Sequence, residues 1–382
     1  MKALLMLVGG RPIPNALTFI HEKPDVIVAI CSEESFKEEW VQLKQAIKKL
    51  SPATTIIKEP PSLDAFNVEA IIETSEHELL EHPDADWVVN ITSGTSLMTL
   101  GAYIAAERCL RLRDMLVKCW YLDTAHSRVI PLVGEKRDAS IFYMEVEQYV
   151  AAYNYNLRNA SNYMNYRSRY LQEDWKVFAR RLGKNPREID LLKLMLVKAA
   201  INRKTSVTKT DDMYQFLLAL ENAGLVRNLC EEEDYCHFYL SDEQHKFLNG
   251  AWLELYVLQE AQSARFFDDI QWHKEIIDND PDRKAKSPFM YKEMDVALTY
   301  KAKLMIVECK TGDGGLDDLV TVADLVGGRF VMKVLVTSRR MENISEDFRS
   351  KSAIKGIRII AQDELSRVGT ILKELAQTAK QR

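Results

Sequence analysis

Two acidic residues and a lysine in the last third of the chain have the types and spacing for metal-assisted phosphate chemistry. Glu308 and Lys310 stand two positions apart, and Asp295 precedes them in a neighbouring run. Residues two apart in a strand share one face, so Cys309 between them points into the core and offers that face only its carbonyl oxygen. Such oxygen ligands suit Mg²⁺ or Mn²⁺, and a lysine beside them can contact phosphate or an attacking water. The pattern predicts a metal site at the two carboxylates and the Cys309 carbonyl, with Lys310 as a catalytic residue.

Two adjacent strands are expected to carry these residues. Strands over 293–300 and 303–310, joined by a turn at 300–302, would bring Asp295 opposite or diagonal to Glu308. The elements expected in residues 246–382 are a helix over 246–263, strands over 269–277, 293–300 and 303–310, a helix over 316–326, a strand over 329–337, a helix over 346–355 and a strand over 357–361. A salt bridge at a strand end is the alternative that E-x-K alone favours.

Two further titratable residues precede the hairpin. Glu293 shares a strand face with Asp295 and could orient a water or a second metal, but solvent exposure at a strand start is the alternative. His273 is expected on the neighbouring strand, where packing beside Trp272 is the alternative to catalysis.

A second chemical pattern follows the apolar runs of residues 1–148, in turns rich in glycine and hydroxyl groups. Glycines let backbone N–H groups approach a ligand, and hydroxyls at a helix start add donors toward phosphate or ribose. The candidates are Gly10, Arg11, Ser32, Thr92, Ser93, Gly94, Thr95, Ser96, Asp123 and Thr124. Ordinary helix capping, which Ser and Thr favour, is the alternative. Neither G-x-G-x-x-G nor G-x-x-x-x-G-K-[ST] occurs, which removes the main support for a dehydrogenase or a P-loop protein.

These turns follow an alternation of strands and helices. The expected strands are 3–8, 26–30, 55–57, 87–92 and 119–122, and the expected helices are 34–50, 68–81 and 96–110. Such alternation predicts an α/β, Rossmann-like domain with a mostly parallel sheet and helices on both faces. Ligands bind beyond the carboxyl ends of the strands in such sheets, which is where the candidate turns lie.

Residues 149–245 predict a helical connector of winged-helix type. Helices over 188–198 and 211–223 and a strand over 236–240 are expected. The helix over 211–223 begins with two acids, and residues 231–234 read Glu-Glu-Glu-Asp, charges that repel DNA phosphate. A structural or dimerising connector is therefore favoured over a DNA-reading one.

Composition excludes several classes. With 51 Lys and Arg against 56 Asp and Glu, the net charge of −5 argues against a chain that coats nucleic acid or membranes. No apolar stretch is long enough to span a bilayer, and no signal peptide is evident, so a cytoplasmic protein without membrane contact is expected. Six cysteines without a C-x-x-C pair fit a reducing compartment.

The first region resembles a known family. The turn Val8-Gly-Gly-Arg-Pro-Ile-Pro-Asn15 and the segment Asn90-x-Thr-Ser-Gly-Thr-Ser-x-Met98 resemble the CRISPR-associated Rossmann fold (CARF) domain, whose fingerprint is close to N-x-T-G-G-T-K-x-M. In that family the domain dimerises and binds a cyclic oligoadenylate across the two-fold axis, which implies that the loop through Met98 binds the ligand. Ser93 replaces the usual glycine and Ser96 the common Lys or Arg, so Arg11 is the nearest candidate to neutralise phosphate.

The last region resembles a second family. Asp295, the hairpin and Glu308-x-Lys310 are similar to the PD-(D/E)-x-K nucleases, and Gly250-Ala-Trp-Leu-Glu254 resembles their G-x-W-L-E helix. The resemblance implies that Glu254 is a further site residue, which assists the metal or its water. Met294 stands where the family name has proline, a position that varies widely.

Both resemblances in one chain describe the CARF nucleases that accompany type III CRISPR systems. They imply a C-terminal restriction-endonuclease-like domain in a homodimer that binds cyclic tetra-adenylate and then cuts DNA, with RNA as a further substrate, using Mn²⁺ or Mg²⁺. Two alternatives remain: a nucleotide-sensing, DNA-binding transcription regulator without cleavage, and a constitutive repair or restriction nuclease whose N-terminal domain only dimerises.

Overall fold

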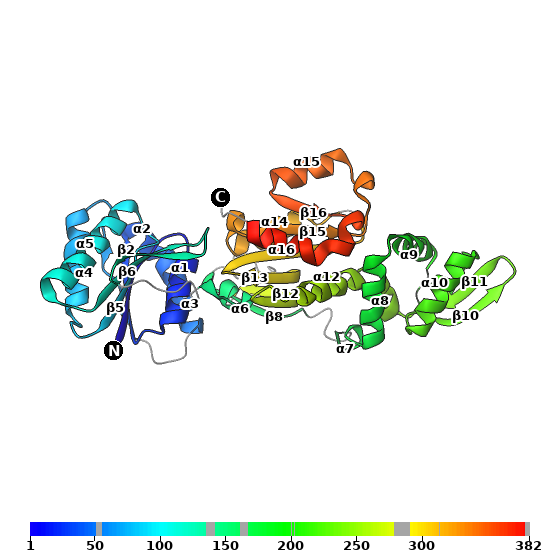
Figure 1. Cartoon of the computed structure of the whole chain (residues 1–382), viewed down its shortest axis with the longest axis horizontal. Coiled ribbons are helices and arrows are strands. Elements are labelled where there is room, and N and C mark those ends of the chain that lie inside the picture. The colour runs from blue at the N-terminus through cyan, green and yellow to red at the C-terminus, as the bar shows by residue number, and fades with distance from the viewer. Residues whose placement is uncertain are drawn as a thin grey trace.

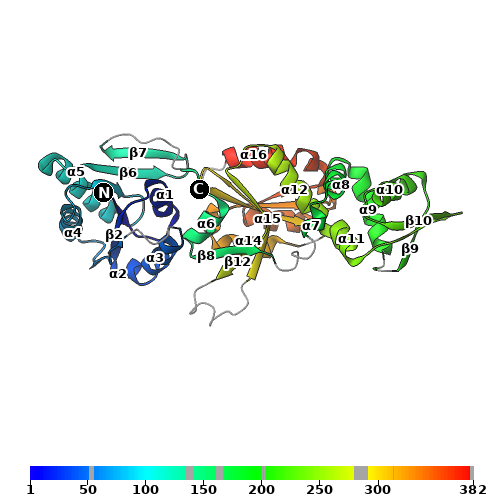
Figure 2. The ribbon, with the colours of Figure 1, turned by 90° about the horizontal axis from the view of Figure 1, so that it is seen from below.

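The structure, a computed structural model, describes residues 1–50, 56–134, 142–160, 167–199, 201, 203–278, 291–312 and 314–378. It has three parts: an N-terminal domain (1–134), a middle unit (167–241) and a C-terminal domain (142–160 and 242–378). The parts lie in a row with the C-terminal domain in the centre, as two views at right angles agree (Figures 1 and 2). Among the described residues, no helix is long and apolar enough to cross a membrane.

The N-terminal domain is built on a seven-stranded, mostly parallel sheet. Its strands are β1 (Lys2–Leu7), β2 (Val26–Ser32), β3 (Ile56–Ile57), β4 (Ser62–Leu63), β5 (Asp86–Asn90), β6 (Val117–Asp123) and β7 (Arg128–Val133). The order is β3-β2-β1-β5-β6-β7, with β4 also paired to β2 and only β7 antiparallel. The predicted Rossmann-like sheet is confirmed; Thr55, predicted to begin a strand, lies outside the described residues.

Helices cover both faces of this sheet. They are α1 (Ile13–Glu22), α2 (Glu33–Lys37), α3 (Glu39–Leu50), α4 (Val68–Leu80) and α5 (Ser96–Arg113). Alternate residues of β1 point to opposite faces: Leu4 and Met6 pack with α1 and α3, while Leu5 and Leu7 pack with α4 and α5.

A buried asparagine ties the sheet to α1. Asn90 is fully buried, and its amide nitrogen lies 3.1 Å from the Pro14 carbonyl, 3.1 Å from Asn15 Oδ1 and 3.0 Å from Thr18 Oγ1. Its amide oxygen accepts from the Thr92 backbone N–H at 3.0 Å. This one side chain therefore satisfies polar groups of two elements in the core.

We expect Asn90→Ala to destabilise the N-terminal domain by about 3 kcal/mol, because several buried polar groups lose their partner at once. Thermal unfolding of the full chain should then begin roughly 6–12 °C lower. The exposed Asn343→Ala is the control and should change the unfolding free energy by less than about 0.5 kcal/mol. Equal midpoints for both variants would contradict the role of this network.

The C-terminal domain has a mixed six-stranded sheet in the order β16-β15-β14-β13-β12-β8. Its strands are β8 (Tyr155–Asn159), β12 (Asp269–Asp278), β13 (Tyr291–Tyr300), β14 (Lys303–Lys310), β15 (Met332–Thr337) and β16 (Ile357–Ile360). Its helices are α6 (Val146–Ala152), α11 (Asp242–Lys246), α12 (Trp252–Ser263), α14 (Leu316–Leu325), α15 (Glu346–Ile354) and α16 (Val368–Thr378), with a π-helical turn at Phe247–Ala251. The strands and helices predicted between residues 246 and 361 are present, while β8 and α16 were not predicted.

The middle unit packs against the far end of this domain. It contains α7 (Arg167–Tyr170), α8 (Glu173–Lys184), α9 (Pro186–Lys198), β9 (Lys204–Thr208), α10 (Asp211–Asn222), β10 (Arg227–Glu232) and β11 (Tyr235–Tyr239). The three strands form a sheet of order β10-β11-β9. The expected helix followed by a strand hairpin is present, but the unit is less purely helical than predicted.

The position of the middle unit corrects one expectation. Residues 149–245 were expected to connect the two domains. The middle unit does not lie between them, because the N-terminal domain packs directly on the C-terminal domain (Figure 1). One hydrophobic core runs through both, joining Met6 and Trp120 to Leu304 and Ile306, and Lys303 Nζ donates to the Ala125 carbonyl at 2.9 Å. The C-terminal sheet also begins earlier than residue 246, since β8 is its edge strand.

Candidate functional site

Four loops at the carboxyl edge of the N-terminal sheet form the first candidate site. β2, β1, β5 and β6 are neighbours and run parallel, so the loops that follow them open at one edge. The strand order reverses between β1 and β5, and such a topological switch point is where sheets of this kind bind ligands. The loops after these two strands touch, since a Cβ on Gly9 would lie 2.7 Å from the Gly94 nitrogen.

Four of the predicted ligand residues are exposed at this edge: Gly10, Arg11, Gly94 and Ser96. A Cβ on Gly10 would meet nothing within 4 Å, so a ligand can approach its backbone. Gly94 has φ +83°, in the left-handed region that favours glycine. Ser96 is the first residue of the long helix α5, whose N-terminal N–H groups suit an anion.

Two of the predicted residues are helix caps. Ser32 accepts a hydrogen bond from the Ser35 N–H at 3.0 Å at the start of α2. Thr95 accepts one from the Met98 N–H at 3.2 Å at the start of α5. The capping alternative therefore describes what these two hydroxyls do in the structure.

Three more point inward and shape the loop. The Thr92 hydroxyl donates to Asn90 Oδ1 at 2.6 Å. Ser93 is only 6 % exposed, and its hydroxyl donates to the Arg11 carbonyl at 3.2 Å, which couples the two loops. Met98 is buried in the core beneath Gly94.

Asp123 and Thr124 follow β6 at the same edge. Asp123 accepts from Arg128 Nε at 2.7 Å and lies 2.8 Å from His126 Nδ1. Burial alone would raise the pKa of Asp123, but these partners lower it, so the group is a carboxylate held in its own turn. Thr124 instead lines a cavity that also reaches the C-terminal domain.

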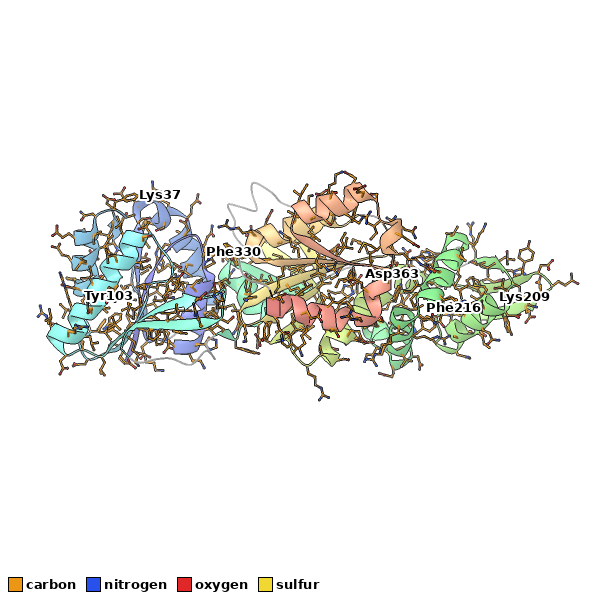
Figure 3. The ribbon with its side chains drawn as sticks, turned by 45° about the horizontal axis from the view of Figure 1, so that its top comes forward. Lys37, Tyr103, Lys209, Phe216, Phe330 and Asp363 are labelled. Carbon is orange, nitrogen blue, oxygen red and sulfur yellow. The ribbon has the colours of Figure 1, made fainter. Side chains whose placement is uncertain are left out.

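This cavity between the domains was not predicted. It is lined by Arg11, Ile13, Pro14, Thr124, Tyr149, Tyr153 and Phe330. The Arg11 guanidinium carbon lies 3.4 Å from the centre of the Phe330 ring, a cation–π contact. Figure 3 places Phe330 where the N-terminal domain meets the C-terminal domain. No motif marks Phe330, so only the packing of the two domains reveals that the predicted ligand loop touches the other domain.

The second candidate site lies at the end of the β13–β14 hairpin. The turn has two residues, Lys301 and Ala302, both with positive φ, and the register pairs Val296 with Val307. The next pair along this register is Asp295 and Glu308, which therefore stand opposite each other, as predicted.

The carboxylates and the lysine meet within this site. Asp295 Oδ2 accepts from the Cys309 N–H at 2.7 Å, and Glu308 Oε1 lies 2.5 Å from Lys310 Nζ. Glu254 comes from α12. The three acids are all buried, at 5–7 % exposure. Cys309 packs in the core, as expected, and burial raises the pKa of its thiol far above the ordinary value, so only its carbonyl is offered to a cation.

Crowding of acids shifts the protonation of the site. Burial raises the pKa of Asp295 well above its ordinary value, and the carboxylates of Glu254 and Glu308 raise it further. Burial also raises the pKa of Glu308, although Lys310 opposes this. Burial would lower the pKa of Lys310, but the neighbouring carboxylates outweigh it and raise that pKa, so the lysine is charged.

These residues fit a hard divalent cation. Two buried carboxylates and a backbone carbonyl are the oxygen donors that Mg²⁺ and Mn²⁺ take, and the raised pKa values are those of acids that lack such a charge. The ligand atoms of Glu254, Asp295 and Glu308 do not all lie within 4.8 Å of one another. Asp295 and Glu308, which stand opposite each other on the hairpin, are the candidate direct ligands, and Glu254 on α12 is the candidate for a role behind them.

A different group, His77, Glu78 and Glu81, is the one place in the described part of the chain where three such ligand atoms lie within 4.8 Å. Lys58 Nζ already pairs with both glutamates there, at 2.6 Å from Glu78. An ammonium group thus takes the place that a cation would need.

The backbone at Gly315, just before α14, lies against the nuclease site. Gly315 has φ +91°, and a Cβ there would lie 3.3 Å from Glu308 Cγ and 3.2 Å from Lys310 Cγ. His273 is buried against Trp272, as the packing alternative expects, and its Nδ1 also lies 3.2 Å from Oε1 of Glu293.

We expect the metal-free chain to lose stability as the pH rises through the pKa of folded Asp295. The folded carboxyl keeps a proton that the unfolded chain releases near its ordinary pKa of 3.8, so its contribution is complete below that pH and falls above it. Asp295→Asn should remove this loss. Thermal midpoints measured in EDTA across pH 4–9 test it; parallel profiles for both proteins would contradict it.

Comparisons with known proteins follow the same division of the chain. Residues 3–149 match the family model described as the Card1 CARF domain, and residues 241–379 match that of the Card1-like endonuclease domain. No curated protein matches the sequence.

Solved structures share the fold at low identity. Can2 from Sulfobacillus thermosulfidooxidans, in complex with cyclic tetra-adenylate, is 19 % identical with a TM-score of 0.73, over 99 % of this chain and 98 % of that one. Protein VC1899 from Vibrio cholerae is 18 % identical with a TM-score of 0.76, over 100 % and 99 %. A type III CRISPR defence DNA nuclease activated by cyclic oligoadenylate is 16 % identical with a TM-score of 0.52; the match covers 88 % of this chain but 45 % of that protein.

The fold and the site define a Rossmann-like CARF domain joined to an endonuclease domain of the PD-(D/E)-x-K type. More particularly, the chain combines a Card1 CARF domain with a Card1-like endonuclease domain, and it is an enzyme of that nuclease class. Both resemblances read from the sequence are thereby confirmed.

Proposed function

We propose that this chain is an endonuclease of type III CRISPR defence that a cyclic oligoadenylate activates, with cyclic tetra-adenylate as the first candidate. One observation carries the proposal: the open, glycine-rich loops of the CARF domain and the buried acids of the nuclease domain belong to one chain whose two domains share a core. The complex of Can2 with cyclic tetra-adenylate and the DNA nuclease activated by cyclic oligoadenylate support it.

The ligand would bind at the exposed part of the CARF loops. Backbone N–H groups at Gly10 and Gly94 and the N-terminus of α5 at Ser96 are suited to phosphates. Arg11 would supply the positive charge that Ser96 lacks. A cyclic ligand with two-fold symmetry fits two copies of this surface, so we propose a homodimer with the ligand on its axis.

The nuclease residues have distinct roles in this proposal. Asp295, Glu308 and the Cys309 carbonyl would hold Mn²⁺ or Mg²⁺, which when bound neutralises phosphate charge and makes a coordinated water more acidic. Lys310, charged and 2.5 Å from Glu308, would orient the attacking water or stabilise charge on the phosphate. Glu254 would hold a water behind the direct ligands.

The substrate is proposed to be DNA, with RNA as a further substrate, because chemistry directed at the backbone reads phosphates rather than bases.

The transcription-regulator alternative needs the middle unit to bind duplex DNA. Its hairpin carries Glu231 and Glu232, which pair with Lys209 and Lys204, and α10 begins with two acids. Lys204 and Lys209 are thus already paired with acids of the hairpin, which favours the nuclease.

Cleavage of labelled single-stranded and supercoiled DNA by the full chain tests the proposal, with Mn²⁺ or EDTA and with or without cyclic tetra-adenylate. We expect cutting only when both metal and ligand are present. Metal-dependent cutting that ignores the ligand would keep the nuclease and overturn the sensor. Duplex binding without any cutting would support the regulator.

A further inference from the structure

His273 occupies an unusual place in β12. It stands in the middle of the strand with φ +48°, while its neighbours Trp272 and Lys274 keep regular pairing with β13. The side chain is only 1 % exposed. A left-handed residue inside a strand is strained, and such strain persists where the surrounding contacts require it.

The contacts of His273 lead directly to the nuclease site. Nε2 lies 3.0 Å from Glu254 Oε2, and Nδ1 lies 3.2 Å from Glu293 Oε1. Glu254 is itself 6 % exposed, whereas the Glu293 side chain is 30 % exposed. The imidazole thus lies between a buried acid of the site, within ion-pair distance of Nε2, and an acid at its rim, within hydrogen-bond distance of Nδ1.

Glu254 needs such a partner. A buried carboxylate near two others is costly unless a donor fixes it, and Lys310 is already committed to Glu308. The extended strand would not by itself aim His273 at α12, so the left-handed turn of its backbone is the feature that permits the contact.

We propose that His273 is a positioning residue of the nuclease site, which holds the Glu254 carboxylate toward the cation position while Glu293 holds the ring. The role rests on the metal-dependent nuclease part of the proposed function and is independent of ligand sensing. Outer partners of this kind typically affect metal affinity by about 10–100-fold. The effect of His273 must pass through Glu254.

Direct Mn²⁺ binding by the full chain tests this, measured as loss of the free Mn²⁺ signal in electron paramagnetic resonance without nucleic acid or ligand. His273→Asn is the main variant, because asparagine tolerates the left-handed backbone but is too short to reach Glu254. We expect Mn²⁺ binding about 10-fold weaker. His273→Gln, which retains a donor, should recover part of the affinity, and the control variant His245→Asn in α11 should bind like wild type.

A double-mutant cycle with Glu254→Gln separates positioning from other roles. If His273 acts through Glu254, His273→Asn should weaken binding little further once Glu254 is replaced. Equal losses in both backgrounds would mean that His273 acts on the metal by itself and would overturn the proposal, as would unchanged affinity in His273→Asn.

Two readouts keep the outcomes distinct. Thermal midpoints in EDTA report whether each variant folds. If His273→Asn does not fold, His273→Gln takes its place in the binding measurement. Absence of Mn²⁺ binding in wild type would overturn the metal site and this role together. A chain that binds Mn²⁺ as expected but ignores cyclic tetra-adenylate would overturn only the sensor.

Discussion

Glu308→Gln should reduce DNA cleavage on the order of 10³-fold or more while the chain keeps its fold. The amide has the size of the carboxylate but not its charge, so it cannot neutralise a divalent cation or pair with Lys310. Removing one of several crowded acids also relieves repulsion, so the thermal midpoint in EDTA should stay equal or rise. Initial rates of nicking with saturating Mn²⁺ and ligand measure the loss.

The exposed Glu346→Gln in the same domain is the matched control and should cut within about twofold of wild type. A Glu308→Gln protein that retains a tenth of the wild-type rate would place the metal elsewhere. A lower thermal midpoint with the same loss of cleavage would instead mean that Glu308 mainly stabilises the fold.

Ser96→Glu should weaken the binding of cyclic tetra-adenylate by about 100-fold or more and abolish activation at ordinary ligand concentrations. The position is exposed at the start of α5, so the new carboxylate would face ligand phosphate, twice in a symmetric dimer. An acid in the first turn of a helix stabilises it, so loss of binding could not be ascribed to unfolding. Calorimetric titration of the full chain measures the affinity.

Ser96→Gln tests size without charge and should bind within a few-fold of wild type. Ser96→Lys restores the cation common in the CARF fingerprint and should tighten binding, at a small cost to α5. If Ser96→Glu and Ser96→Gln bind alike, phosphate does not approach this helix end.

The interior of both sheets was predictable because buried strands are short apolar runs with clear ends. β14 was predicted with its observed bounds, and β1, β2, β3, β5 and β6 of the CARF sheet were predicted within about two residues, whereas the short β4 was not predicted. Among the elements that were not predicted, three have local explanations. Pro12 and Pro14 obscure the start of α1, although proline is tolerated in a first helical turn. β7 and β8 are edge strands without clean alternation, and β8 finds its partner, β12, more than a hundred residues away.

The candidate sites show the same limit. Alternation along two strands sufficed to place Asp295 opposite Glu308. The contact of His273 with Glu254 depends on one left-handed backbone angle, which sequence periodicity does not encode. A hydroxyl that caps a helix and a hydroxyl left exposed at a helix start have the same sequence signature, so Ser32 and Ser96 could be told apart only in three dimensions.

The stacking of Arg11 on Phe330 has a consequence for how the sensor is tuned. If Arg11 must leave the Phe330 ring to neutralise ligand phosphate, breaking this contact costs about 1–2 kcal/mol of the binding free energy. The ligand concentration needed for activation is then roughly tenfold higher. The ligand concentration needed for activation then depends partly on a residue of the nuclease domain. A substitution at Phe330 would change this concentration without any change in the loops that bind the ligand.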